Sequence, residues 1–223
     1  MKTTAIIVAA GTGSRFKSET PKQFLDLAGK PVIEHTLRRF QSAPSVDAII
    51  LVLAKDHIRL FDTPELAKPL KIVAGGPTRA HSVLNGINAV EPTTRIVAVH
   101  DGARPFVSVD EIERTIEKAN EMGAACLVGP VIDTIKTIRG NEISGTLDRR
   151  KLRRAMTPQA FRIEVLRRAF EMGELDESVT DECYLVEKLG HPIEFIEGSS
   201  RNIKITHADD LVLARALVED VTE

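Results

Sequence analysis

The sequence lacks the features that mark membrane proteins and disulfide-linked proteins. It has two cysteines in 223 residues, Cys126 and Cys183, and neither has a second cysteine at CxxC spacing. Both lie in apolar or helical contexts, which favours reduced, buried thiols and a cytoplasmic compartment. The apolar run at residues 1–10 is too short to cross a bilayer, and a glycine-rich loop follows it in place of a signal-peptide cleavage site. We therefore expect a soluble, cytoplasmic protein without a membrane partner.

An excess of charge of one sign is also lacking. The formal net charge is −2, and the charged residues, 28% of the chain, mix acids and bases throughout. Nothing in this balance favours nucleic acid or an anionic membrane surface as a partner. A phosphate-bearing ligand would have to be held by a few local cations. Internal repeats, low-complexity tracts and linker-like stretches are absent too, so we expect one domain over residues 1–223 with a single insertion.

Short apolar runs alternate with longer amphipathic segments along the chain. The apolar runs predict strands at residues 4–9, 48–54, 71–74, 95–100, 124–128, 192–196 and 203–206. The amphipathic segments predict helices at 32–41, 58–66, 78–90, 109–122, 162–172, 181–189 and 208–221, and Ser108 with Glu111 predicts a capping box. This alternation predicts an α/β fold with a doubly wound, mostly parallel, Rossmann-like sheet.

Residues 133–150 break the alternation. They show a weak two-residue period with a Gly140-Asn141 turn signal, which predicts a β-hairpin arm inserted within the domain. The segment has too few large apolar residues to fold alone, so it must pack on something, and a second subunit is the natural candidate. A mobile surface excursion is the alternative.

The first predicted strand ends in small residues, Ala9-Ala10-Gly11-Thr12-Gly13-Ser14-Arg15. Such residues after a parallel strand let backbone N–H groups approach a phosphate, on the side of the sheet where ligands bind. Phe16 replaces the third glycine of a dinucleotide fingerprint, and no P-loop pattern is present. The cations Arg15 and Lys22 suit a triphosphate. A tight turn without a ligand is the alternative.

Asp101 follows the apolar run at 95–100 and so lies at the carboxyl end of a predicted strand. A carboxylate there suits Mg²⁺, which binds through one or two carboxylates together with phosphate oxygens and water. A turn aspartate is the alternative. His100 is more simply a strand-end residue, since the six histidines show no metal-ligand spacing. The stretch Thr180-Asp181-Glu182 is typical of a helix cap.

Several motifs, taken in order, resemble one family. Besides the glycine loop and Pro21-Lys22-Gln23-Phe24, they are Gly75-Gly76 with Arg79-Ala80-His81-Ser82-Val83, Val99-His100-Asp101-Gly102-Ala103-Arg104-Pro105, Asp133-Thr134-Ile135-Lys136, Thr157-Pro158-Gln159-Ala160-Phe161, Thr180-Asp181-Glu182 and Asn202-Ile203-Lys204-Ile205-Thr206. The first two are similar to the sugar-nucleotide pyrophosphorylase superfamily, and the whole set resembles its 2-C-methyl-D-erythritol 4-phosphate cytidylyltransferases. Gly102 stands where alanine is usual, and Pro77 where a polar residue is common, which puts the base-side contacts there in doubt.

The resemblance implies a role for each matching residue. The nucleotide would be bound by Ala9, Ala10, Gly11, Gly13, Gly76 and Ser82. Catalysis would rest on Arg15, Lys22 and Lys204, and Asp101 would hold a divalent cation, Mg²⁺, and the substrates. The acceptor, 2-C-methyl-D-erythritol 4-phosphate, would meet Asp101, Arg104, Thr157 and Lys204. Thr134 and Arg149, on the arm, would reach into the site of a second copy, which implies a homodimer.

The implied reaction joins the acceptor phosphate to the α-phosphorus of CTP and releases pyrophosphate, a step of isoprenoid precursor synthesis. The nucleophile is already an anion, so the lack of an obvious Ser–His or Cys–His pair is consistent with it. Catalysis would come from positioning and from cations. A ribitol 5-phosphate cytidylyltransferase and a non-catalytic nucleotide-binding homologue are the alternatives. The stretch 198–204 favours the methylerythritol acceptor over ribitol, and the retained cations and Asp101 argue against loss of catalysis.

Overall fold

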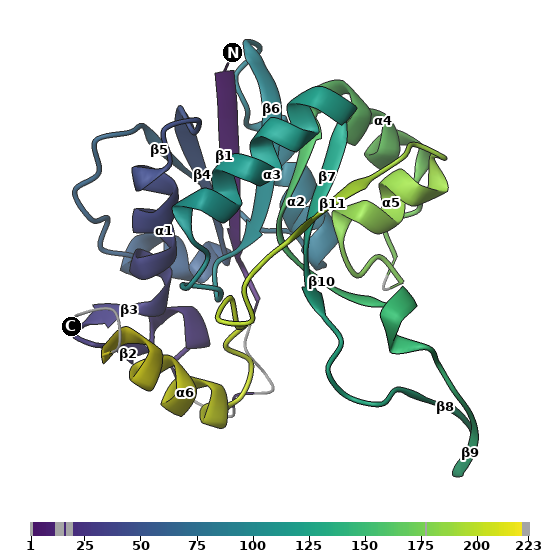
Figure 1. Ribbon diagram of the computed structural model, residues 1–223. Helices are drawn as coiled ribbons and strands as arrows, with labels where there is room; N and C mark the ends of the chain where they lie inside the picture. The colour runs from purple at the N-terminus through teal and green to yellow at the C-terminus, as the bar shows by residue number, and fades with distance from the viewer. Residues whose placement is uncertain (1, 12–15, 17–19, 177, 220–223) are drawn as a thin grey trace.

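The computed structural model describes residues 2–11, 16, 20–176 and 178–219. Over these residues a sheet of seven strands forms the centre, in the order β11-β7-β10-β6-β1-β4-β5 (Figure 1). The strands are β1 (Lys2–Ala9), β4 (Ala48–Leu53), β5 (Leu70–Ala74), β6 (Thr94–Asp101), β7 (Ala124–Pro130), β10 (Arg153–Arg162) and β11 (Glu194–Glu197). The helices are α1 (Val32–Ser42), α2 (Arg79–Asn88), α3 (Val109–Met122), α4 (Ile163–Met172), α5 (Glu182–Lys188) and α6 (Ala208–Glu219). The predicted α/β fold with a mostly parallel sheet is confirmed.

Helices cover both faces of the sheet because its strands are apolar on both sides. Side chains of α1 and α3, such as Leu37 and Ile112, share one core cluster with the sheet. Side chains of α2, α4 and α5, such as Val83 and Phe170, share the other. Cys126 and Cys183 are buried in this second cluster as free thiols, as the sequence predicts.

Strand β10 was not predicted from the sequence. It lies antiparallel between β6 and β7, so the sheet is mixed at this point. Its sequence begins with basic residues and contains Pro158, which cannot donate to a strand ladder and therefore argues against a central strand. The register shifts between Ala155 and Gln159, and this irregularity accommodates Pro158.

Two predicted elements are wrong. Residues 58–66 do not form an α-helix: a 3₁₀ turn, η3 (Lys55–Leu60), is followed by irregular chain that contains Pro64. Proline lacks an N–H and disfavours helical backbone before it. Residues 203–206 do not form a strand, because the carbonyls of Asn202 and Ile205 accept hydrogen bonds from side chains and not from a neighbouring strand.

The predicted hairpin is confirmed. Strands β8 (Lys136–Arg139) and β9 (Glu142–Thr146) pair antiparallel around Gly140, whose φ of 58° suits the tight turn. They form a sheet of their own and project away from the central sheet (Figure 1). The 3₁₀ turn η4 (Arg149–Lys151) leads back toward β10.

Helix α6 closes the opposite side of the molecule. A third core cluster joins Ala214 of α6 to Leu27 and Val32 and to Ile205. Leu27 belongs to a small ladder of β2 (Asp26–Leu27) and β3 (Lys30–Pro31), which follows the 3₁₀ turn η2 (Lys22–Phe24). This packing fixes the segment between β11 and α6 against the end of the sheet.

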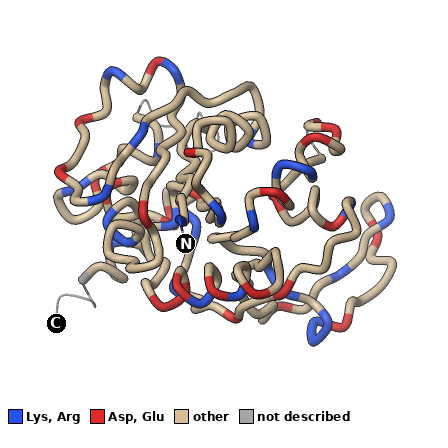
Figure 2. Tube along the Cα trace, turned by 90° about the horizontal axis from the view of Figure 1, so that it is seen from above, with Lys and Arg blue, Asp and Glu red and all other residues tan. Residues whose placement is uncertain are grey.

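Basic and acidic residues are spread along the whole described chain trace (Figure 2). Within the described part of the chain, every helix is too short or too polar to span a lipid bilayer.

Candidate active site

A cavity of about 420 Å³ opens at the carboxyl ends of the parallel strands β1, β5 and β6. We call it the first cavity. It falls in the range of roughly 300–1,000 Å³ typical of small-molecule sites. Its walls come from the loops after those strands and from the segment before α6: Val8, Ala9, Ala10, Gly11, Lys22, Gln23, Gly76, Pro77, Thr78, Arg79, Ser82, Asp101, Ala103, Lys204 and Thr206.

Gln23 holds the start of the glycine loop in place. Its buried side-chain amide donates to the carbonyl oxygens of Ala9 at 2.9 Å and Gly11 at 3.3 Å. Because Gln23 satisfies these two carbonyl oxygens, it fixes the backbone where Ala9 and Gly11 line the cavity. From the sequence, Gln23 is only one member of the Pro21-Lys22-Gln23-Phe24 motif.

The loop after β5 needs glycine for its close packing. A Cβ on Gly75 would lie 2.3 Å from Cβ of Ala10, and one on Gly76 would lie 2.5 Å from Cβ of His81. The Gly76 N–H donates to Oγ of Ser82 at 3.1 Å, and that hydroxyl donates to the carbonyl of Thr78 at 2.9 Å. Ser82 therefore shapes the loop that lines the cavity opposite the glycine loop.

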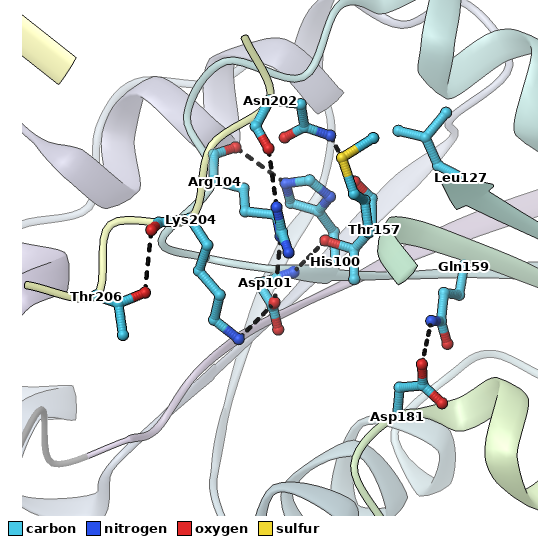
Figure 3. Close-up of polar contacts among 12 residues, drawn as sticks. His100, Asp101, Arg104, Leu127, Thr157, Gln159, Asp181, Asn202, Lys204 and Thr206 are labelled. Carbon is cyan, nitrogen blue, oxygen red and sulfur yellow. Dashed lines mark hydrogen bonds and ion pairs between the residues drawn. The ribbon is translucent and has the colours of Figure 1, made fainter. Parts of the chain in front are cut away.

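Asp101, the last residue of β6, gathers three cations around its carboxylate. Lys204 Nζ lies 2.8 Å and Arg104 Nε 3.4 Å from Oδ2, while Arg79 Nε lies 3.3 Å from Oδ1. Figure 3 shows Lys204 and Arg104 extending toward Asp101 from separate segments. The Asp101 N–H also donates to Oγ1 of Thr157 at 3.1 Å.

Arg79 makes a second, stronger contact that the sequence did not reveal. Its Nη1 and Nη2 donate to the two carboxylate oxygens of Glu182 at 2.5 Å and 3.1 Å. Glu182 is 0% exposed and opens α5, where Asp181 caps the helix by accepting from the Tyr184 N–H. The helix-cap interpretation of this stretch is thus confirmed, but Glu182 also reaches the site.

A smaller cavity of about 220 Å³, the second cavity, adjoins the first. It is lined by Arg79, Asp101, Arg104, Ala155, Met156, Thr157, Gln159, Thr180, Asp181 and Lys204. Arg79, Asp101 and Lys204 line both cavities. One group of opposite charges therefore forms the wall between two openings of different size.

The segment that carries Lys204 is fastened by its backbone. The Ile205 N–H donates to the carbonyl of Ala103 at 2.9 Å, and the Ile205 carbonyl accepts from Lys22 Nζ at 2.8 Å. Arg104 Nη1 donates to the Asn202 carbonyl at 2.8 Å. These contacts bring Lys22 and Lys204, far apart in sequence, to the same cavity.

The charge cluster controls the ionisation of Asp101. Burial alone would raise its pKa, but Arg79, Lys204 and Arg104 outweigh burial and hold the pKa well below its usual range. Burial works to lower the pKa of Arg79 as well, yet Glu182 and Asp101 outweigh it and raise that pKa. Burial raises the pKa of Glu182 against the opposing effect of Arg79. Because its bidentate partner Arg79 stays protonated, we describe the pair as two charges.

The divalent cation expected at Asp101 stays a prediction. No group of three or more His, Cys, Asp or Glu side chains suited to a metal ion occurs within the described ranges. A single ionised carboxylate beside a cavity is nevertheless a suitable protein ligand for Mg²⁺ when phosphates and water supply the other oxygens.

The structure brings most of the predicted site residues together. The first cavity is lined by Ala9, Ala10, Gly11, Lys22, Gly76 and Ser82, the second by Arg104 and Thr157, and both by Asp101 and Lys204. Gly13 and Arg15 lie outside the described residues. Thr134 and Arg149 lie at the two ends of the arm, and the cavity walls given above do not include them.

A cavity at the carboxyl edge of a doubly wound sheet, lined by Lys22, Arg79 and Lys204 and by the carboxylate of Asp101, is typical of an enzyme that binds phosphates. The family model for 2-C-methyl-D-erythritol 4-phosphate cytidylyltransferase matches residues 3–220. A relative of that name from Syntrophus aciditrophicus is 41% identical over 226 residues, which cover 98% of this chain and 96% of the relative.

Other relatives agree. A bifunctional enzyme IspD/IspF of Desulfotalea psychrophila is 43% identical over 228 residues, and the match covers 100% of this chain but only 58% of that longer protein. The crystal structure of 4-diphosphocytidyl-2C-methyl-D-erythritol synthase from Anaerococcus prevotii is similar with a TM-score of 0.83 and 29% identity, covering 98% of each chain. The crystal structure of 2-C-methyl-D-erythritol 4-phosphate cytidylyltransferase from Thermus thermophilus is similar with a TM-score of 0.80 and 33% identity, covering 98% of this chain and 100% of the other. The chain belongs to the 2-C-methyl-D-erythritol 4-phosphate cytidylyltransferase family.

His100 predicts how stability depends on pH. Burial lowers its pKa to about 4, and Arg104 and Lys204 also lower it, against an opposing effect of Asp101 and the Arg104 carbonyl. The unfolded chain takes up a proton below a pKa of about 6.5. The stabilisation by neutral His100 is therefore full above that value and is lost as pH falls toward 4, by about 2 kcal/mol between about pH 7 and pH 5.

Urea unfolding in a chelator-containing buffer at these two pH values measures the effect. His100→Gln can still donate to the Arg104 carbonyl, which accepts from His100 Nε2 at 3.1 Å, but it does not titrate. We expect this variant to lose about 2 kcal/mol less than the parent between the two pH values. An equal loss in both proteins would contradict the assignment.

Proposed function

We propose that this chain transfers a cytidylyl group from CTP to 2-C-methyl-D-erythritol 4-phosphate, yielding 4-diphosphocytidyl-2-C-methyl-D-erythritol and pyrophosphate. The observation that carries the proposal is the pair of cavities that share Arg79, Asp101 and Lys204. A transfer between two phosphorylated substrates requires two adjoining sites with cations at their junction. The larger cavity would take CTP and the smaller one the sugar-alcohol phosphate.

The chemistry needs no general base, because the attacking phosphate oxygen is already ionised. That oxygen forms a bond to the α-phosphorus of CTP, and the bond to the pyrophosphate leaving group breaks. The obstacle is the approach of one anion to another, which Lys22 and Lys204 would relieve by placing positive charge beside the phosphates. The N-terminus of α2, which opens on the first cavity at Thr78 and Arg79, adds a favourable field for anions.

Asp101 would hold Mg²⁺ when the nucleotide is bound. The ion would neutralise phosphate charge there. The Thr157 hydroxyl holds the Asp101 backbone, while the carboxylate contacts three cations, at least one of which Mg²⁺ would have to replace.

The arm supports a homodimer in which each copy completes the site of the other. Ile138 and Ile143 on the arm are 72% and 68% exposed, and Leu147 on the arm and Ile132 just before it are exposed as well. A two-stranded hairpin that carries exposed apolar side chains is marginal in water, so a covering partner would stabilise it. Thr134 and Arg149 would then lie near the second cavity of the other copy.

An acceptor panel tests the proposed function. Pyrophosphate release is followed with each of the four nucleoside triphosphates and with 2-C-methyl-D-erythritol 4-phosphate or ribitol 5-phosphate as acceptor. We expect release with CTP and the methylerythritol phosphate. A preference for ribitol 5-phosphate would identify the other acceptor, and tight CTP binding without any release would identify a non-catalytic homologue.

Lys22→Ala removes one cation from the first cavity. Loss of one such stabiliser of transition-state charge lowers kcat by about a hundredfold to a thousandfold. Lys30→Ala is the matched control, since Lys30 belongs to the same segment but is half exposed and lies 3.8 Å from Glu34. Near-normal turnover by a folded Lys22→Ala protein would remove Lys22 from the mechanism.

Complementation tests the shared site. Arg149→Ala and Lys204→Ala each inactivate the protein, but a mixed dimer holds one site with Lys204 from one copy and Arg149 from the other. Co-expression should restore about a quarter of the parent activity, since half of the dimers are mixed and each has one intact site. Co-expression of Lys22→Ala with Lys204→Ala is the control and should restore nothing. If neither pair of variants restored activity, the arm would not contribute to the site of the other copy.

A further inference from the structure

The pair of Arg79 and Glu182 has no assigned role in the reaction described above. It joins α2 to α5 across 103 residues of sequence and lies in the wall shared by the two cavities. A buried ion pair contributes little to stability compared with apolar side chains of similar volume. Since stability alone does not explain the pair, its place between the two cavities points to a role in the reaction.

Arg79 is held on several sides. The two hydrogen bonds to Glu182 use both terminal nitrogens, and Nε together with Nη2 lies 3.3 Å from Oδ1 of Asp101. Every hydrogen bond described for this guanidinium thus goes to a carboxylate. Lys204 differs, because its side chain is 34% exposed and the one ion pair described for it is to Asp101.

Glu182 is held as firmly as Arg79. Its N–H and that of Cys183 both donate to Oε1 of Gln159 at 3.1 Å, and Nε2 of Gln159 donates to Asp181 at 3.0 Å. Gln159 is a buried residue of β10, so the first turn of α5 is fastened to the central sheet. The backbone of Glu182 therefore stays in place if Arg79 turns toward a ligand, and its carboxylate can follow only as far as its side chain reaches.

The charges around the junction nearly balance. Arg79, Arg104 and Lys204 bring three positive charges; Asp101 and Glu182 pair with them, and Asp181 in the wall of the second cavity brings a third negative charge. Without the Glu182 charge, Arg79 would lose its bidentate partner and the junction would carry a surplus of positive charge. A phosphate group would then capture Arg79, and Asp101 would lose the partner that fixes its Oδ1.

We infer that Glu182 is a positioning residue that holds Arg79 in the wall between the two cavities, so that Arg79 orients the Asp101 carboxylate and does not itself capture phosphate. The inference rests on the proposed function, since the anions concerned are the substrates and the pyrophosphate product of that reaction. Glu182 thereby keeps the junction from binding pyrophosphate too tightly to release it.

Glu182→Gln tests the inference because it removes the charge and keeps the shape. We expect kcat to fall by about tenfold or more, while inhibition by pyrophosphate becomes about tenfold tighter, because a freed guanidinium forms charge-assisted hydrogen bonds with the anion. Damage that is merely structural would weaken pyrophosphate binding along with kcat. That outcome, or unchanged kinetics, would overturn the inference.

Glu111→Gln is the matched control. Glu111 is also a buried glutamate in the first turn of a helix, but it accepts hydrogen bonds from the backbone of Ser108 and Ser199 and contacts no arginine of the junction. This variant should lower the melting temperature and leave pyrophosphate inhibition unchanged. A tightening of equal size in both variants would show that the effect is not specific to Arg79.

Glu182→Asp keeps the charge but shortens the reach to Arg79. We expect this variant to have a reduced kcat and an inhibition constant for pyrophosphate close to that of the parent. A kcat equal to that of the parent would overturn the inference, even if the Glu182→Gln protein failed to fold. Calorimetric binding of pyrophosphate to the parent and Glu182→Gln proteins needs no turnover. It therefore tests the effect of the Glu182 charge on pyrophosphate binding even without turnover. Absence of cytidylyl transfer by the parent protein would refute the proposed function, whereas equal pyrophosphate affinity of the two proteins would refute this inference.

Discussion

The carboxylate of Asp101 is the point on which the site is assembled. Arg79 from the start of α2, Arg104 from the loop after β6 and Lys204 from the segment before α6 all reach it. Three cations at this spacing repel one another strongly in a partly buried environment, and a central anion turns that repulsion into attraction. The end of the sheet, the second β–α connection and the C-terminal segment are consequently held together by one side chain.

The same arrangement explains how a protein with almost no net charge can serve two phosphate-bearing substrates. The positive charge is concentrated where the phosphates must meet and is held there by Asp101 before they arrive. The three cations are not equivalent in this respect. Arg79 is bound to two buried carboxylates, those of Glu182 and Asp101, whereas the half-buried Lys204 has one described ion pair, so Lys204 is the cation best placed to exchange a carboxylate for a phosphate. The fixed and the exchangeable cation thus differ in the number of carboxylates that hold them.

Local signals explain which parts could be predicted from the sequence. The apolar runs of β1, β4 and β6, the capping box at Ser108 and the Gly140 turn depend on near neighbours, and the structure agrees with each. Strand β10 was missed because basic residues and Pro158 argue locally against a strand, while its place between β6 and β7 depends on distant pairing. Arg79 and Glu182 are 103 residues apart in sequence, and no local pattern in either segment predicts their contact. Family motifs located Asp101 and Lys204, but only the fold reveals that they touch.

The arm raises a question of a different kind, namely what covers a hairpin that projects from the central sheet. Strands β8 and β9 pair only with each other among the described strands, and the isoleucines of this hairpin face solvent. Such a hairpin gains little from its own hydrogen bonds and apolar contacts, so its order depends on what covers it. If the cover is a second copy, the free energy that orders the arm and the free energy that completes the second cavity come from the same contact. Assembly and activity would then be coupled by physical necessity, since a chain that leaves its arm uncovered also leaves its partner's acceptor site without Arg149.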